Sequence, residues 1–133
     1  MNAMPVTSIL VGYAVALLVA LSLPISLYRM KARIKSGDGG DEALRRLVRA
    51  QGNYIEYAPL GLLALALAEL GGWPPAWLWG AGGAFMAART IQAIGIRTDQ
   101  LNLRKVGTVV THLSLLTLGA LLLTGGFLAL QPA

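Results

Sequence analysis

A stripe of polar side chains along one predicted helix carries the residue types that bind charged groups. Arg49, Asn53, Glu56 and Tyr57 stand at positions i, i+4, i+7 and i+8, so an α-helix would present all four on one face. Arg46 extends the stripe by one turn. The stripe offers fixed charges of both signs, an amide and a phenol. Two interpretations stay open, a functional polar site and a buried polar network that fixes helix packing.

The elements that position this stripe are predicted to be four membrane-crossing helices. The chain has 133 residues and a mean hydropathy of +0.63. A crossing helix needs about 20 mostly apolar residues. Four such runs occur, near residues 5–28, 42–70 (apolar from 54), 76–96 and 103–130. The sequence therefore predicts an all-α fold, with residues 1–133 forming a single integral membrane four-helix domain.

The distribution of positive charge predicts the topology. No basic residue precedes the first run and Arg29 follows it, which reverses the charge order of a cleavable signal peptide, so we expect this helix to be retained. The positive-inside rule then places the first and third connections in the cytoplasm and both termini outside. The basic residues are Arg29, Lys31, Arg33, Lys35, Arg45, Arg46 and Arg49 around the first connection, and Arg89, Arg97, Arg104 and Lys105 around the third.

The depth of Glu56 is informative. At about 1.5 Å per residue it lies roughly 10 Å further along the helix than Arg49. If Arg49 lies at the interface, Glu56 lies below the headgroups, where an unpaired charge costs several kcal/mol. We therefore expect Glu56 to be paired or to line a wet cavity. Pro59 removes a backbone donor just beyond it and predicts a bend that opens a pocket.

The third and fourth helices offer partners for the stripe. Arg89 and Gln92, at i and i+3, share a face that could meet it. His112 is the only histidine, and a hydrogen-bonded packing role is favoured over catalysis or metal binding because no second ligand stands nearby. The chain has no cysteine, which excludes a thiol nucleophile, and we predict no metal site.

Further patterns concern packing and the membrane surface. Asp41 is predicted to cap the second helix. Membrane topology and anionic lipid explain the basic residues beside the apolar spans, so no nucleic-acid partner is expected. Small residues predict a close approach of the third helix, and tryptophans predict an interfacial belt. The small residues are Gly80, Gly83, Ala84, Ala87 and Ala88, and the tryptophans are Trp73, Trp77 and Trp79.

Residues 49–60, RAQGNYIEYAPL, resemble the second-helix signature of the MAPEG superfamily, the membrane-associated proteins in eicosanoid and glutathione metabolism. The shared pattern is an Arg, an Asn four residues later, a Glu three after that, an aromatic residue and a Pro. Four spans, the chain length and the basic first connection match as well, so the resemblance covers essentially the whole chain. It implies a homotrimer in the membrane, expected to be a bacterial inner membrane, that binds glutathione between adjacent subunits near the cytoplasmic side.

The resemblance also implies individual roles. Glutathione carries two carboxylates and an ammonium group, which call for cations and a carboxylate in the site. A nearby guanidinium favours thiolate over thiol. By position, the glutathione contacts would be Arg49, Gln51, Asn53, Glu56 and Tyr57 with Arg29 of a neighbouring subunit, and the thiol-activating cation would be Arg104, with Arg97 second.

Three functions follow as hypotheses. The first is a glutathione-dependent transferase or peroxidase acting on a lipophilic electrophile from the bilayer. The second is a non-catalytic protein of the same fold that binds lipid or glutathione. One observation favours this second hypothesis over the leading first one: Thr90 and Ile94 stand where leukotriene C4 synthase-like members carry tyrosines. The third is a small multidrug exporter with Glu56 as its proton-coupled carboxylate.

Overall fold

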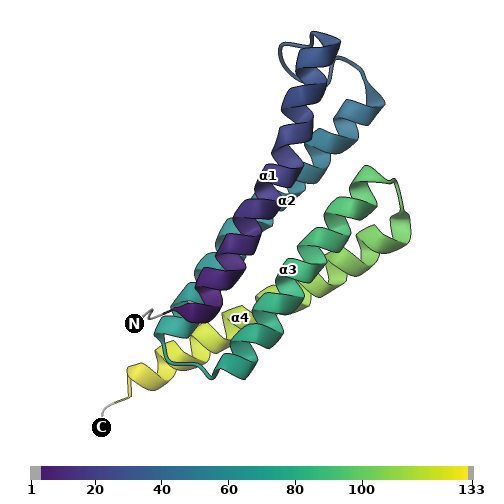
Figure 1. Cartoon of the computed structure of the whole chain (residues 1–133). Helices are drawn as coiled ribbons and strands as arrows, with labels where there is room; N and C mark the ends of the chain where they lie inside the picture. Colours follow the sequence, from purple (N-terminus) through teal and green to yellow (C-terminus); the bar gives the residue numbers. More distant parts are fainter. Residues whose placement is uncertain (1–3, 132–133) are drawn as a thin grey trace.

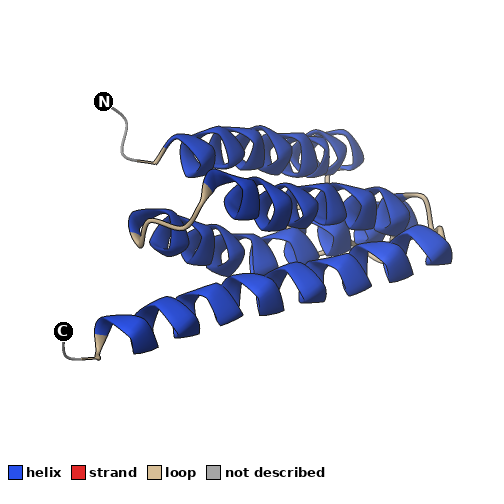
Figure 2. Ribbon diagram, turned by 90° about the horizontal axis from the view of Figure 1, so that it is seen from below, coloured by secondary structure: helices blue, strands red, loops and turns tan. Residues whose placement is uncertain are grey.

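The chain folds into four long helices. The computed structural model describes residues 4–131. The helices are α1 (Pro5–Ala32), α2 (Glu42–Leu70), α3 (Pro75–Arg97) and α4 (Leu101–Ala129). The start of α1 and the end of α4 lie at one end of the bundle, and the first and third connections lie at the other (Figures 1 and 2). The predicted all-α fold is confirmed, and the helix limits differ from the predicted ones by a few residues.

Asp41 begins α2 as the sequence predicts. One carboxylate oxygen accepts the Leu44 N–H at 3.0 Å, and the other accepts the Tyr28 hydroxyl at 2.7 Å. Hydrogen bonds from the Leu44 N–H and the Tyr28 hydroxyl hold the pKa of Asp41 below its ordinary value. The end of α1 is thereby fastened to the start of α2, which fixes the direction in which the stripe of α2 faces.

The outer surface of the bundle is apolar. The helices α1 and α4 are each long and apolar enough to cross a membrane. Large apolar side chains such as Leu116 (70% exposed) and Phe127 (68% exposed) cover their outward faces. A continuous apolar surface of this extent is typical of a lipid or protein contact.

Glycines set the distance between helices, although they are not the predicted ones. A Cβ added at Gly82 would lie 2.8 Å from Leu10 Cδ1, and one at Gly107 would lie 2.5 Å from Gln92 Cβ. A Cβ at Gly80 or Gly83 would meet nothing within 4 Å. The predicted close approach therefore does not occur at Gly80 or Gly83 within the chain, because a methyl group would have room at both, whereas Ala88 of the predicted set is buried (1% exposed).

The helices are paired as two hairpins, α1 with α2 and α3 with α4. The pairs separate toward the end that carries the two basic connections (Figure 1). There α2 faces the α3/α4 hairpin across a cavity, so the fold places the predicted stripe where the hairpins diverge.

Replacing Gly107 by alanine should loosen the α3/α4 hairpin. The new methyl group would overlap the backbone of Gln92, whose N and Cα atoms would lie 2.9 Å away. Overpacking of this kind costs about 1–3 kcal/mol, so the thermal midpoint in detergent micelles should fall. Gly119→Ala, in the same helix with nothing within 4 Å of the new Cβ, is the matched control and should not lower it. Equal midpoints for the two variants would contradict this packing.

Candidate functional site

A cavity of about 750 Å³ lies between α2 and the α3/α4 hairpin. Its volume is within the range of about 300–1,000 Å³ that is usual for small-molecule sites. Its walls combine charged, polar and apolar side chains. The lining residues are Val48, Arg49, Gly52, Asn53, Glu56, Tyr57, Gln92, Ile96, Leu101, Arg104, Lys105, Thr108 and Val109.

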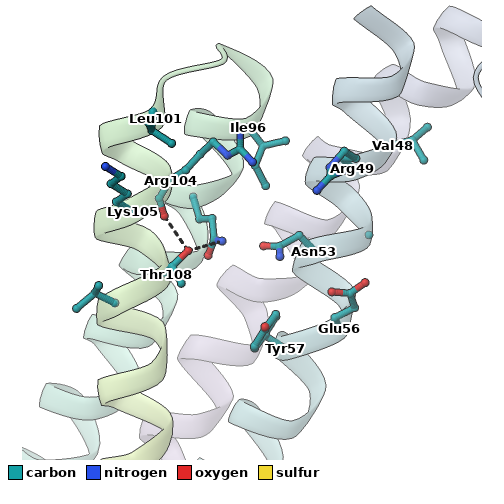
Figure 3. Close-up of a pocket in the computed structure, with 13 residues that line it drawn as sticks. Val48, Arg49, Asn53, Glu56, Tyr57, Ile96, Leu101, Arg104, Lys105 and Thr108 are labelled. Carbon is teal, nitrogen blue, oxygen red and sulfur yellow. Dashed lines mark hydrogen bonds between the residues drawn. The ribbon is translucent and has the colours of Figure 1, made fainter. Parts of the chain in front are cut away.

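The stripe on α2 faces this cavity. Arg49, Asn53 and Tyr57 project from α2 toward the α3/α4 hairpin, where Arg104 lies opposite (Figure 3). Glu56 also lines the cavity. The helical spacing therefore predicted one shared face, and the structure adds a residue of α4 to it. α2 stays helical through Pro59, although this residue has no backbone N–H to donate.

Arg29 and Gln51 lie outside the cavity of their own chain. The Arg29 guanidinium donates to the carbonyl oxygen of Gly37 in the first connection, at 2.9 Å from Nη2. The Gln51 side chain donates to the Ser22 hydroxyl of α1 at 2.9 Å. Arg97 does not line the cavity either. Within one chain, the structure thus brings together five of the seven predicted site residues.

Arg49 and Glu56 are exposed and have no ion-pair partner among residues 4–131. Arg104 has only a long contact with Asp99, at 3.9 Å. Arg49, Arg104, Lys105 and Glu56 are the charged residues in the described lining, so cations exceed carboxylates. The cavity can therefore bind a molecule with more negative than positive charge.

Arg89 lies buried behind three residues that line the cavity, Asn53, Tyr57 and Gln92. Its side chain is 1% exposed. Its Nη2 atom donates to Oδ1 of Asn53 and, at 2.8 Å, to Oε1 of Gln92. Its guanidinium carbon lies 4.9 Å from the centre of the Tyr57 ring, in a cation–π contact. Arg89 thereby holds two residues of α2 that line the cavity.

His112 lies next to Tyr57. Its Nδ1 atom is 2.7 Å from the carbonyl oxygen of Thr108, and its ring meets the Tyr57 ring edge-on with centres 5.8 Å apart. The predicted hydrogen bond of His112 is present, and the side chain is exposed, so its packing role stays a prediction.

The third helix does not contribute Thr90 or Ile94 to the cavity. The Thr90 hydroxyl donates to the Met86 carbonyl and lies 2.7 Å from the Tyr13 hydroxyl of α1. Ile94 is 47% exposed on another face. Gln92 and Ile96 line the cavity instead.

Comparison with known proteins agrees with this architecture. The model of the MAPEG family matches residues 7–124. The chain belongs to the MAPEG family. The match includes most of all four helices and every residue that lines the cavity of this MAPEG protein.

This MAPEG protein is also similar to a bacterial membrane protein. It is 28% identical over 100 residues to the inner membrane protein YecN of Escherichia coli strain K12. The matched region covers 75% of this chain and 76% of YecN. YecN of Escherichia coli strain CFT073 has the same identity and coverage. The family and the apolar helices together show that the chain is a membrane protein.

Sequence reasoning missed the charged edge of the cavity. Asp99 has a left-handed backbone (φ 57°) in the third connection and lies 3.5 Å from Arg46 Nη1 and 3.9 Å from Arg104 Nη1. It links α2 to the α3/α4 hairpin near the connections. Its position between two basic helix ends was the one feature of the sequence that could have suggested an ion pair. The direction of its side chain could not be predicted, because it depends on the conformation of the turn.

Proposed function

We propose that this MAPEG protein binds glutathione in the cavity and conjugates it to, or uses it to reduce, a lipophilic electrophile from the bilayer. The single observation that supports this most is that Arg49 and Glu56 share the cavity face of α2 without ion-pair partners among residues 4–131. Glutathione carries two carboxylates and one ammonium group, which matches an excess of cations around one carboxylate.

Arg104 is the proposed thiol-activating residue. It lines the cavity from α4, opposite the stripe of α2. A nearby guanidinium stabilises a thiolate, which is the nucleophilic form of a thiol. The sulfur gives its proton to water in the open cavity, and the thiolate forms a C–S bond with the electrophile, from which a leaving group departs or whose conjugated double bond takes up the electron pair and a proton. Reduction of a hydroperoxide would use two glutathione molecules and give their disulfide, an alcohol and water. The apolar lining residues Ile96 and Val109 would contact the lipophilic partner.

We also propose a homotrimer with the site completed across the subunit interface. Arg29 and Gln51 contact other groups of their own chain and lie outside its cavity. In a trimer they would serve a neighbouring cavity, as the family resemblance implies. The exposed apolar faces of the helices are available for subunit and lipid contacts.

A non-catalytic binding protein of the same fold is the second candidate. The lining itself supports it, because α3 contributes Gln92 and Ile96 and Tyr57 is the only phenol among the described residues of the cavity. Binding of glutathione without turnover of aryl halides, enones or lipid hydroperoxides would select this candidate.

Arg49→Ala and Glu56→Gln should each weaken glutathione binding by about tenfold or more, because each removes a charge-assisted contact. Isothermal titration of the detergent-solubilised protein measures this. Arg45→Ala and Glu42→Gln are matched controls, since both residues lie on α2, pair with each other at 3.0 Å and are outside the cavity. The absence of any binding at millimolar glutathione would refute the proposed function.

All four helices are proposed to cross the inner membrane, with the basic connections in the cytoplasm. The natural chain has no cysteine, so single cysteines report on topology without background. A membrane-impermeant maleimide should label Gln131→Cys in intact cells but label Ser36→Cys and Thr98→Cys only after permeabilisation. Labelling of Ser36→Cys and Gln131→Cys from the same side would contradict this topology.

A further inference from the structure

Arg89 determines which way the Asn53 amide points. A guanidinium has hydrogen-bond donors and no acceptor, so the Asn53 atom that it contacts must be the carbonyl oxygen. Rotating the amide by half a turn would set two donors against each other. The Asn53 side chain also lines the cavity. Its NH2 group, which has no hydrogen-bond partner among residues 4–131, is therefore the part left for a ligand.

The same guanidinium sets the direction of a chain of hydrogen bonds through α3 and α4. Since Oε1 of Gln92 accepts from Arg89, its NH2 group must donate, and it does so to the Thr108 hydroxyl at 3.0 Å. That hydroxyl in turn donates to the carbonyl oxygen of Arg104 at 2.8 Å. One N–H of Gln92 and the Thr108 hydroxyl proton are thus bonded between the helices, whereas both N–H donors of Asn53 stay available to the cavity.

Arg89 also brings a buried charge that has no carboxylate in direct contact, although the Glu56 carboxylate is near enough to attract it. The side chain is 1% exposed, it forms no ion pair with a carboxylate of residues 4–131, and its Nε and Nη1 atoms have no hydrogen-bond partner there. A buried cation of this kind is costly unless an anion lies nearby. An anionic group of a ligand next to Asn53 would lessen that cost.

We propose that Arg89 is a positioning residue that holds the Asn53 N–H groups toward the cavity, so that this part of the site selects a carboxylate oxygen of the ligand and rejects its ammonium group. Arg49, one helical turn before Asn53, faces the same space. The proposal rests on the proposed function for the identity of the ligand, glutathione. The orientation of Asn53 itself rests on the Arg89 contact alone.

Two substitutions at Asn53 test the orientation by the sign of their effect. Asn53→Ala removes the donor and should weaken glutathione binding by about fivefold or more. Asn53→Asp keeps an acceptor for Arg89 but turns a carboxylate oxygen toward the ligand's carboxylate, so it should bind more weakly still than Asn53→Ala. Titration calorimetry on the detergent-solubilised full chain gives the order. Binding by Asn53→Asp that equals the wild type or exceeds Asn53→Ala would overturn the proposal.

Thermal unfolding without ligand is an independent test of the Asn53 orientation. In the wild-type background, Asn53→Asp gives the buried guanidinium a carboxylate partner, so the midpoint should be kept or raised while affinity is lost. If Asn53 had only a structural role, the substitution would lower the thermal midpoint and the glutathione affinity together. In an Arg89→Gln background the same substitution should lower the midpoint. Equal lowering in both backgrounds would overturn the proposal.

Arg89→Lys keeps a buried cationic donor and should retain the affinity order of the Asn53 variants. If Arg89→Gln does not fold, Arg89→Met, which also lacks the charge, replaces it as the background, and Asn53→Asp should lower the midpoint there too. Failure of the wild type to bind glutathione would refute the proposed function, and the unfolding arm would still decide the orientation of Asn53.

Discussion

Charged groups below the level of the lipid headgroups must be paired, solvated or in contact with a ligand, and this constraint organises the structure. Glu56 lies roughly 10 Å along α2 from Arg49, and neither has an ion-pair partner within residues 4–131. The two hairpins separate at the end with the basic connections, and both side chains line the cavity between them.

The cavity is kept in shape by contacts of two kinds. Glycines let the helices approach closely at Gly82 and, beside the cavity-lining Gln92, at Gly107, where a methyl group has no room. Beside the opening, the buried Arg89 connects α2 to α3 through Asn53, and Gln92 continues the connection to α4. Close packing and the directed hydrogen-bond network therefore meet at Gln92, between α3 and α4.

Much of this arrangement could be predicted from the sequence. The helices follow from long apolar runs, and the shared face of Arg49, Asn53 and Glu56 follows from helical periodicity, which does not depend on tertiary contacts. Asp41 was predictable as a cap for the same reason, since a cap is a local interaction. The cluster on α2 is therefore visible in the sequence alone.

What could not be predicted depends on how each helix is rotated against its neighbours. The choice of Gly82 over Gly80 and Gly83 as the close contact, and the position of Thr90 against Tyr13, are set by the rotation of α3. Arg89 was recognised as facing the cluster, but its complete burial and its contact with the Tyr57 ring required three helices to be placed together.

The most direct test of the central claim is an experimental structure of the solubilised protein with glutathione. The account predicts tripeptide density in the cavity, with a carboxylate beside Arg49 and the ammonium group beside Glu56. Arg49 and Glu56 side chains that point into the detergent belt, or neutralise one another in a closed bundle with no bound tripeptide, would contradict it.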